Sequence, residues 1–401
     1  MFNLDYFFTF EVLYFLIALF GLSFFRNYRG VIIAEVIVNL GLCYFLFFRK
    51  GSLGFYPLLF LLITSFLIYL LSKTRKLRAV SFFIPVIVLI LSRILPQIEM
   101  GDLAVHFGGS APAVFARSGL MLTIPMIGLS YLVFRWYRFL IDSKESPSGF
   151  FAFLYYCFYV PVFYIGPITS FKEFSLSSNG EYKRTPRVFG IAILRLIWGA
   201  AKFYPLASIF YQLTFSRLLL NLNPQINLLQ FLMALIAYPT YLFLNFSGFI
   251  DLVIGISAIL GIQIDKNFDR PYLSTSVGEF WRCWHISLTE LLKDLIHIPT
   301  LKFLERCGLN NSYINYCIAV TFVFLVMAYW HGGTSSFYMF SILQIFALLI
   351  QRSLRHKWAQ QDSVKMLWLK RFALWLFLAV SFFFFENSHE QIQIILQKIR
   401  F

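Results

Sequence analysis

The chain has 401 residues, of which 59% are hydrophobic and 13% are charged, and it carries a formal net charge of +15. Soluble domains are about 45–50% apolar and about 25% charged, so this composition excludes an ordinary cytosolic enzyme, a disordered protein and a secreted disulfide scaffold. The basic excess is typical of membrane proteins that hold Lys and Arg in cytoplasmic loops, and no basic-aromatic pattern indicates nucleic-acid binding.

The apolar stretches predict an all-α, polytopic integral membrane protein with about 11 transmembrane helices. The stretches before the middle of the chain are residues 6–25, 31–48, 55–71, 80–95, 115–136, 150–168 and 188–213. The stretch 228–262 is too long for one span, and its polar residues near 245–248 predict a division into two spans. The last stretches are residues 313–330, 337–350 and 367–385.

The loops between the early stretches carry contrasting charges, which predict the orientation of the chain. Residues 73–78 include four basic side chains, whereas the loop with Glu99, Asp102 and His106 has no Lys or Arg before Arg117. Because basic loops stay on the cytoplasmic side, the first loop is predicted inside, the second outside and the N-terminus outside. No basic region precedes the first apolar run, which is therefore predicted to be a retained membrane segment rather than a cleaved signal peptide.

Several stretches contain positions that a regular spanning helix does not tolerate. Pro161, Gly166 and Pro167 interrupt the stretch 150–168. Irregular backbone at membrane depth occurs only where it is buried in protein or lines a wet cavity. Residues 263–305 mix charged and aromatic side chains, which predicts short helices that lie in the interface or dip into the protein.

Two pairs of basic residues also lie within predicted helices. Arg195 and Lys202 are seven residues apart and share one helix face, and Arg135 and Arg138 share another. A buried charge needs a partner or water, and the alternative for Arg138 and Lys202 is that they snorkel to the membrane interface.

Two histidines are candidates for chemistry. His331 ends an apolar run and precedes Gly332 and Gly333, which predicts a general base that a substrate can approach, or otherwise a histidine hydrogen-bonded at the interface. His285 is a second candidate, or otherwise a helix-surface histidine packed among aromatic residues. A thiolate nucleophile at Cys283 is a weaker alternative. The motifs GxSxG, GxGxxG, HExxH and the Walker loop are absent, so we predict no metal and no nucleotide.

Several motifs follow one another along the chain between residues 128 and 332. They are GLSY at 128–131, GPITSFKEF at 166–174, NFSGFID at 245–251, NFDRPY at 267–272, FWRCWHISL at 280–288 and WHG at 330–332. Together they resemble the membrane-bound O-acyltransferases over roughly residues 120–350. Within that family the chain is most similar to the bacterial branch, which holds the teichoic-acid D-alanyl transferase and the O-acetyltransferases of alginate and cell-wall polysaccharides.

The resemblance implies an architecture and a location. It implies a single membrane domain over residues 1–401, with spanning helices around a thinned central funnel. Residues 1–115 would form N-terminal spanning helices, 120–350 the motif-bearing catalytic core, and 351–401 a C-terminal helix and tail. The location implied is the bacterial cytoplasmic (inner) membrane.

The resemblance also implies roles for individual residues. By motif match, His331 is the catalytic base, and His285 occupies the position of the family's second functional residue. Candidates for substrate binding or positioning are Trp284, Trp330, Ser287, Asn245, Ser247, Asp251 and Thr334. A donor-side basic group would comprise Lys183, Arg184, Arg270 and Arg282. These basic residues would attract an anionic donor, or otherwise serve only topology and anionic headgroups.

The function implied is the transfer of a small acyl group across the membrane to hydroxyls of a cell-surface or cell-wall polymer. The donor would be a cytoplasmic thioester, carried by a phosphopantetheine carrier protein or by acyl-CoA, and no bound cofactor is expected. The acceptor side would involve the polymer itself or a membrane-anchored or extracellular partner transferase. D-alanyl is favoured slightly over acetyl, and alginate-type polysaccharide O-acetylation is the alternative.

A transporter or flippase is a rival function, although the interrupted apolar stretches are not mirrored in the first part of the chain, as they often are in transporters with inverted repeats. A scaffold that has lost activity is a third reading, which the presence of both histidines disfavours.

Overall fold

The computed structural model describes residues 10–25, 30–48, 55–94, 128–143, 149–163, 165–220, 225–354 and 363–400. These residues are mostly helical, as predicted. Packing divides the chain into a first unit, Met1–Ile193 with Val253–Asp265, and a second unit, Leu194–Leu252 with Lys266–Phe401. The acidic loop that includes Glu99, Asp102 and His106 lies outside the described residues. The three-part division at residues 115 and 351 within a single domain stays a prediction.

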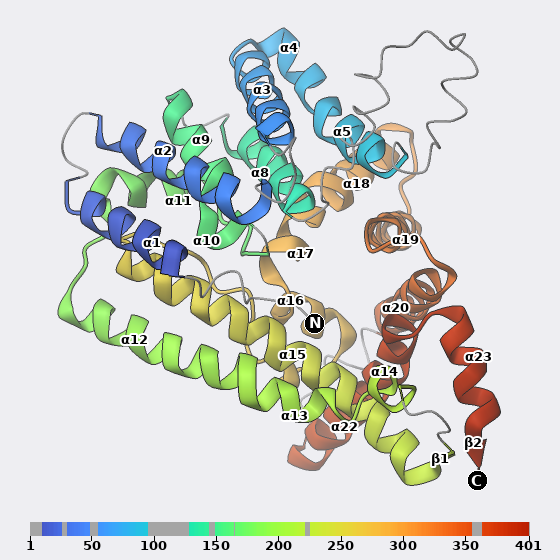
Figure 1. The fold of residues 1–401 in the computed structure, drawn as a ribbon. Coiled ribbons are helices and arrows are strands. Elements are labelled where there is room, and N and C mark those ends of the chain that lie inside the picture. The colour runs from blue at the N-terminus through green and yellow to red at the C-terminus, as the bar shows by residue number, and fades with distance from the viewer. Residues whose placement is uncertain are drawn as a thin grey trace, which may run out of the picture. The chain divides into compact units, whose positions relative to one another are not determined.

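The first unit is built from short helices, coloured blue to green in Figure 1. They are α1 (Phe10–Ser23), α2 (Val31–Cys43) with η2 (Tyr44–Phe48), α3 (Phe55–Ser72), α4 (Arg75–Ser81), α5 (Phe83–Ile94), α8 (Leu129–Asp142), α9 (Phe150–Phe158), α10 (Val160–Phe163), α11 (Phe171–Leu176) and η4 (Ser177–Glu181). The break predicted in the stretch 150–168 is confirmed, because α9 ends before an extended Tyr159 and irregular backbone follows at 166–170.

Two side chains from neighbouring helices bond to the free backbone groups at the break between α9 and α10. Arg135 of α8 is 2% exposed and donates to the carbonyl oxygens of Tyr156 (3.2 Å) and Cys157 (2.8 Å), which the end of α9 leaves without helical partners. Asn39 Oδ1 of α2 accepts from the Val160 N–H at 3.0 Å. The buried charge of Arg135 therefore has the polar partners that the sequence required, and they come from the interrupted backbone itself.

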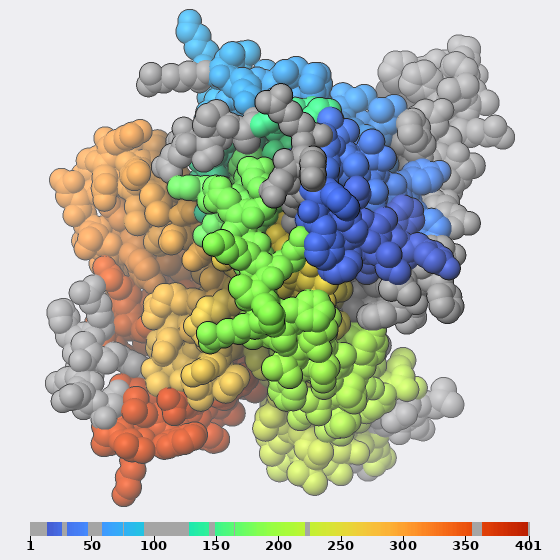
Figure 2. All heavy atoms as spheres, turned by 90° about the vertical axis from the view of Figure 1, so that its left-hand side faces the viewer, coloured from blue at the N-terminus to red at the C-terminus, as the bar shows by residue number. Residues whose placement is uncertain are grey.

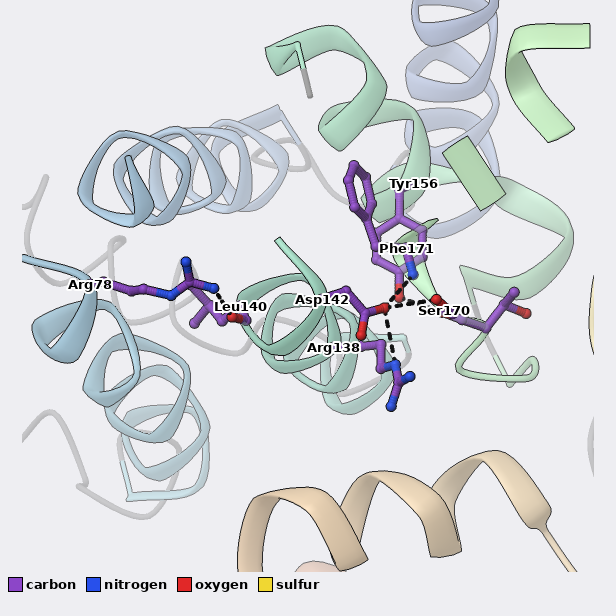
Figure 3. A network of polar contacts seen from close by, with 8 residues as sticks. Arg78, Arg138, Leu140, Asp142, Tyr156, Ser170 and Phe171 are labelled. Atoms are coloured by element: carbon purple, nitrogen blue, oxygen red, sulfur yellow. Dashed lines mark hydrogen bonds and ion pairs between the residues drawn. The ribbon is translucent and has the colours of Figure 1, made fainter. Parts of the chain in front are cut away.

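The motif segment 166–174 is tied to α8 through one carboxylate (Figure 3). Asp142 Oδ2 accepts from Ser170 Oγ at 3.0 Å and from the Phe171 N–H at 2.8 Å, which caps α11. The same oxygen accepts from Arg138 Nε at 3.1 Å, with 19% of the Arg138 side chain exposed. Arg138 thus forms an ion pair with Asp142, one helical turn away. Its charge therefore has a partner within the protein and does not need to reach the membrane interface.

The second unit contains the long helices. It comprises the second half of α12 (Pro186–Ala201), η5 (Lys202–Leu206), α13 (Ala207–Tyr211), α14 (Phe215–Leu218), β1 (Ile226–Asn227), most of α15 (Leu228–Ile259), η6 (Pro271–Leu273), α16 (Val277–Cys283), α17 (Ile286–Leu292), η7 (Lys293–His297), α18 (Ile298–Arg306), α19 (Ser312–Trp330), α20 (Ser335–Ser353), α22 (Val364–Glu386), α23 (His389–Lys398) and β2 (Ile399–Arg400). The strands β1 and β2 pair in parallel. The short helices predicted in residues 263–305 are confirmed.

Five helices of the described chain are long and apolar enough to cross a membrane. They are Pro186–Tyr211, Leu228–Ile259, Ser312–Trp330, Ser335–Ser353 and Val364–Glu386. Figure 2 shows α12 in green at the surface, where Leu194, Ile197 and Trp198 are each more than half exposed. Large apolar side chains exposed along such a helix are suited to lipid. The predicted total of about 11 spans stays a prediction.

The predicted division of the stretch 228–262 near residues 245–248 is wrong, because α15 is one continuous helix of 32 residues. The polar residues do not break it, since Ser247 and Asp251 bond to Arg195 and Lys202 on the neighbouring segment while the backbone hydrogen bonds continue. Where α15 runs beside α12 (Figure 1), a Cβ at Gly248 would lie 2.7 Å from the Phe203 nitrogen and 2.9 Å from the Gly199 carbonyl oxygen. Gly248 therefore serves close helix packing rather than a turn.

Candidate active site

His331 follows directly on the end of α19, at a glycine-dependent cap. The Gly332 N–H donates to the Tyr329 carbonyl (3.2 Å), and the Gly333 N–H donates to the Ala328 carbonyl (3.0 Å). This pair of bonds is the Schellman motif, whose residue after the cap needs a positive φ. Gly332 and Gly333 have φ of 138° and 67°, conformations that other residues adopt only with strain. The two glycines thus end α19 and fix the backbone that carries the imidazole.

Aromatic rings surround the His331 imidazole without burying it fully. Its centroid lies 4.4 Å from that of Trp330, 5.6 Å from that of Phe337 on α20, and 5.0 Å from that of Phe385 on α22. His331 is half-buried, so the ring is held in place yet remains open to a substrate. A general base needs both properties.

His285 is buried and strained. It is the N-cap of α17 with φ 47° and ψ 52°, a left-handed conformation that costs free energy in a non-glycine residue and is common at functional sites. The flanking backbone holds it there: Phe268 pairs with Trp284 as an antiparallel bridge, and the Asp269 N–H donates to the Cys283 carbonyl at 2.9 Å. The ring packs edge-to-face on Phe246 with centroids 4.9 Å apart.

The two histidines lie within range of each other's charge. Burial, and to a smaller extent the positive charge of a protonated His331, lower the pKa of His285 to about 3. His285 is therefore neutral at physiological pH. His331, half-buried and at the end of α19, is the better placed of the two rings to accept a proton.

This difference gives a testable pH dependence. A histidine can act as a base only while its ring is neutral. Because the pKa of His285 is about 3, its protonation should contribute nothing above about pH 4. We therefore expect the rate profile to show no step from the ionisation of His285 above about pH 4. A step above pH 4 that His285→Gln removes would contradict this assignment.

Two of the predicted positioning residues belong to the packing around His285. Trp284 is 6% exposed and stacks on Phe280 with centroids 5.3 Å apart, so its indole is part of the core. Ser287 donates through its backbone N–H (3.0 Å) and its Oγ (2.9 Å) to Asn267 Oδ1. Their proposed contact with substrate stays a prediction, while their role in holding the His285 loop is explicit in the structure.

Ser247 and Asp251 belong to a cluster of charges on facing helices. Asp251 accepts from Arg195 Nη1 at 2.9 Å and from Lys202 Nζ at 2.5 Å, and Lys202 Nζ also donates to Ser247 Oγ at 3.1 Å. Lys202 is 7% exposed, so the cluster, rather than snorkelling, supplies its partner. The carboxylate of Asp251 thus satisfies the two cations that share one face of α12 and η5.

Asn245 differs from its neighbours in lacking a partner. Its side chain is 1% exposed, and its Nδ2 has no hydrogen-bond acceptor among the described residues. Buried amide donors are nearly always satisfied, so this one is unusual. That Asn245 binds substrate stays a prediction. Thr334 is an exposed N-cap of α20, and the ring centroids of Trp330 and His331 lie 4.4 Å apart. That Trp330 and Thr334 bind or position substrate stays a prediction.

The predicted basic residues fall into different settings. In the first unit, Lys183 is exposed, whereas Arg184 donates to Ser23 Oγ (2.7 Å) and to the Ser23 carbonyl (2.8 Å). In the second unit, Arg270 is exposed with φ 49° at the start of η6. Arg282 is exposed near the end of α16. Arg184 is therefore a structural contact as well as a charge, which makes it a poor probe of donor attraction.

Arg282 has a neighbour that sequence reasoning missed. The guanidinium of Arg352, at the end of α20, lies 5.1 Å from the ring centroid of Tyr316 on α19, and the charges of Arg352 and Arg282 both act on that phenol. Across the described part of the chain, neither arginine forms an ion pair with a carboxylate. Two unneutralised guanidinium groups near one tyrosine suit a phosphate-bearing ligand. Arg352 carries no motif, so only the pairing of α19 with α20 could reveal it.

Besides Arg352, Asn267 is a second residue near the site that the sequence analysis did not single out. Its Oδ1 receives two hydrogen bonds from Ser287, its backbone oxygen accepts from the Ile286 N–H at 2.9 Å, and its Nδ2 lies 3.2 Å from His285 Nδ1. The signal available in the sequence was its place at the start of the NFDRPY motif.

Cys283 has no thiol hydrogen bond within the described segments, and the imidazole of its neighbour His285 faces Asn267.

Both histidines and the motifs around them fall inside a match to a known family. Residues 42–389 match the model of the MBOAT, membrane-bound O-acyltransferase family. The chain belongs to this family. Together with the five apolar helices, membership makes the protein a multi-pass membrane protein, and the resemblance seen in the motifs is confirmed.

Curated members of the MBOAT family that are similar to this chain carry three different names. A teichoic acid D-alanyltransferase of Streptococcus thermophilus is 28% identical over 58% of this chain and 58% of its own length. A peptidoglycan O-acetyltransferase of Helicobacter pylori is 26% identical over 53% of this chain and 40% of its own length. A probable alginate O-acetylase of Pseudomonas putida is 36% identical over 30% of this chain and 23% of its own length. The matched region thus spans less than two thirds of each relative.

Proposed function

We propose that this MBOAT protein transfers a small acyl group from a cytoplasmic thioester to hydroxyls of a cell-surface or cell-wall polymer. The observation that carries the proposal is the pairing of a half-buried His331 with a buried, neutral His285 in the second unit. One ring can accept a proton, and the other can remain uncharged beside it. Acyl transfer to an alcohol requires a proton acceptor in a partly apolar site.

The chemistry assigned to these residues balances without a metal. His331 takes the proton of the acceptor hydroxyl as its oxygen attacks the thioester carbonyl carbon. The carbon–oxygen bond forms, the carbon–sulfur bond breaks, and the imidazolium returns the proton to the departing thiolate. The products are an ester and a free thiol. The negative charge that develops on the carbonyl oxygen needs hydrogen-bond donors in a site that excludes water.

A phosphate-bearing donor fits the basic pair at the other end of α19. Tyr316 and His331 are fifteen residues apart on this helix, which corresponds to about 22 Å at 1.5 Å per residue. A donor with its phosphate held by Arg282 and Arg352 would need a long, slender arm to bring its thioester to His331. Phosphopantetheine, attached to a carrier protein or within acyl-CoA, has that chemistry. The alternative occupant of this basic pair is the headgroup of an anionic lipid.

Charge reversal at Arg282 tests this donor site. We expect Arg282→Glu to raise the KM for a carrier-protein or acyl-CoA donor at least tenfold at low salt, because a favourable contact becomes repulsive. Lys365→Glu is the matched control, since it makes the same change of two charges at an exposed position at the start of α22. Equal KM values for Arg282→Glu and Lys365→Glu would mean that the basic pair does not recognise the donor.

The names of the similar proteins suggest two candidates for the acyl group. D-alanyl is favoured slightly, because the similarity to a teichoic acid D-alanyltransferase covers 58% of both chains. O-acetylation of a peptidoglycan- or alginate-type polymer is the second candidate, favoured by the relatives with those names. We place the protein in the bacterial cytoplasmic membrane with its N-terminus outside. Its proposed partners are the donor, and the polymer or an extracellular transferase that receives the acyl group.

The experiment that tests the proposal measures esters on surface polymers. A strain lacking this protein should lose either ester-linked D-alanine or O-acetyl groups, as quantified by mass spectrometry of isolated teichoic acid, peptidoglycan and polysaccharide. Complementation with the intact protein should restore the ester. Unchanged esters together with altered uptake of a solute would instead favour the transporter.

A further inference from the structure

The orientation of one buried amide determines what His285 can do. Asn267 Oδ1 lies 3.0 Å from the Ser287 backbone nitrogen and 2.9 Å from Ser287 Oγ. A backbone N–H can only donate, so the atom facing it must be the amide oxygen. The amide nitrogen of Asn267 is thereby placed on the other side, 3.2 Å from His285 Nδ1.

An amide NH2 can only donate, so its partner on the ring must accept. Nδ1 of His285 then carries no proton, and in a neutral imidazole the proton resides on Nε2. The amide oxygen lies farther from Nδ1, at 3.4 Å, and is already occupied by two donors from Ser287. The low pKa of His285, which burial causes, keeps the ring in this neutral form.

We infer that Asn267 is a positioning residue that fixes His285 as the Nε2–H tautomer, so that His285 acts as a hydrogen-bond donor to the acyl carbonyl oxygen while His331 acts as the base. The inference rests on the proposed acyl transfer. It separates the roles of two histidines that would otherwise be interchangeable. In the step described above, the Nε2–H of His285 stabilises the oxyanion that forms as the thioester carbon becomes tetrahedral.

Asn267 also has a purely structural task, which any test must keep separate. Its side-chain and backbone oxygens accept from the Ser287 and Ile286 N–H groups, two of the unpaired donors at the start of α17. His285 itself provides no side-chain cap. Removal of the Asn267 side chain would therefore loosen α17 whether or not the tautomer matters.

Asn267→Asp separates the two tasks because it is isosteric. One carboxylate oxygen keeps the cap on Ser287, and aspartate is as good an N-cap as asparagine. The other oxygen replaces the amide nitrogen opposite His285 Nδ1, where it can only accept. A neutral His285 must then move its proton from Nε2 to Nδ1, and its donor toward the acyl oxygen is lost.

The experiment uses the full-length protein labelled with 15N-histidine. NMR of the ring nitrogens at about pH 8.5, where imidazoles are neutral, reports the tautomer directly. The His285 signals are assigned by their absence from His285→Gln. We expect an Nε2–H ring in the unmodified protein and an Nδ1–H ring in Asn267→Asp. An Nδ1–H ring at His285 in the unmodified protein overturns the inference, whether or not the protein transfers acyl groups.

Activity provides the second readout. We expect Asn267→Asp to lower kcat by about 10²–10³-fold, the usual effect of removing one oxyanion donor, at a temperature where the variant is still folded. His285→Gln keeps an N–H near the position of Nε2 and should retain more activity than His285→Ala. If Asn267→Asp reverses the tautomer and leaves kcat unchanged, the donor role is wrong. Absence of acyl transfer in the unmodified protein would instead count against the proposed function and leave the tautomer result standing.

Discussion

His331→Ala is expected to reduce acyl transfer by about 10²–10⁴-fold, the contribution that a general base makes. The imidazole at the end of α19 is half-buried beside three aromatic rings, and His285 cannot replace it, because burial keeps the pKa of His285 near 3. The measurement is the rate of ester formation by purified protein under saturating donor. Amounts of protein in the membrane fraction and the melting temperature should stay close to those of the unmodified protein.

His389→Ala is the matched control for this substitution. His389 begins α23, is exposed, and has a ring nitrogen 3.0 Å from the side-chain nitrogen of Gln393, so its loss should leave the rate within about twofold. If His331→Ala protein that is correctly inserted and folded transfers acyl groups at the normal rate, His331 is not the base. The aromatic cage around it would then be a structural feature.

Asp251→Asn is expected to have the largest effect on stability. It removes the only carboxylate that the structure places against Arg195 and Lys202, within the described part of the chain, and leaves a buried ammonium group without a counter-ion. Breaking a buried ion pair costs about 3–5 kcal/mol. We expect the lower end of that range, because 38% of the Arg195 side chain is exposed and screened. The measurement is the thermal unfolding midpoint in detergent.

Asp269→Asn provides the comparison for this stability effect. It removes the same kind of charge from an i,i+3 pair with Lys266, in which both side chains are at least half exposed. Exposed pairs contribute about 0–1 kcal/mol, so the midpoint should barely move. If Asp251→Asn is as stable as Asp269→Asn, the charge cluster between α12, η5 and α15 does not stabilise the fold.

Local patterns in the sequence were sufficient to predict most of the helices. The apolar runs before Trp330 and Glu386 correspond to α19 and α22, and the proline at position 161 marked the interruption after α9. The same patterns misplaced a break in α15. Polar residues in an apolar run indicate either a turn or a tertiary contact. In α15 they form a tertiary contact, because Asp251 pairs with Arg195 and Lys202, which lie about fifty residues away in the sequence.

Site residues that lie in a recognisable motif could be predicted from the sequence. Residues whose role depends on the folded conformation could not. The motif WHG identified His331, and its glycine, Gly332, proved to form the helix cap together with the following Gly333. The role of Asn267 depends on the left-handed conformation of His285 and on the direction in which one amide points. Neither is encoded in spacing along the chain. Arg352 was missed for the same reason, because its neighbour Tyr316 lies on a different helix.

The most direct test of acyl transfer with His331 as the base is ester formation by the purified protein in proteoliposomes. A donor with an isotopically labelled acyl group is supplied to one side, as D-alanyl carrier protein or acetyl-CoA, and a hydroxyl-bearing polymer is supplied to the other. Mass spectrometry then measures label on the polymer. We expect labelled ester with one of the two donors for the unmodified protein and a loss of about 10²-fold or more for His331→Ala. Equal labelling by the two proteins would contradict it.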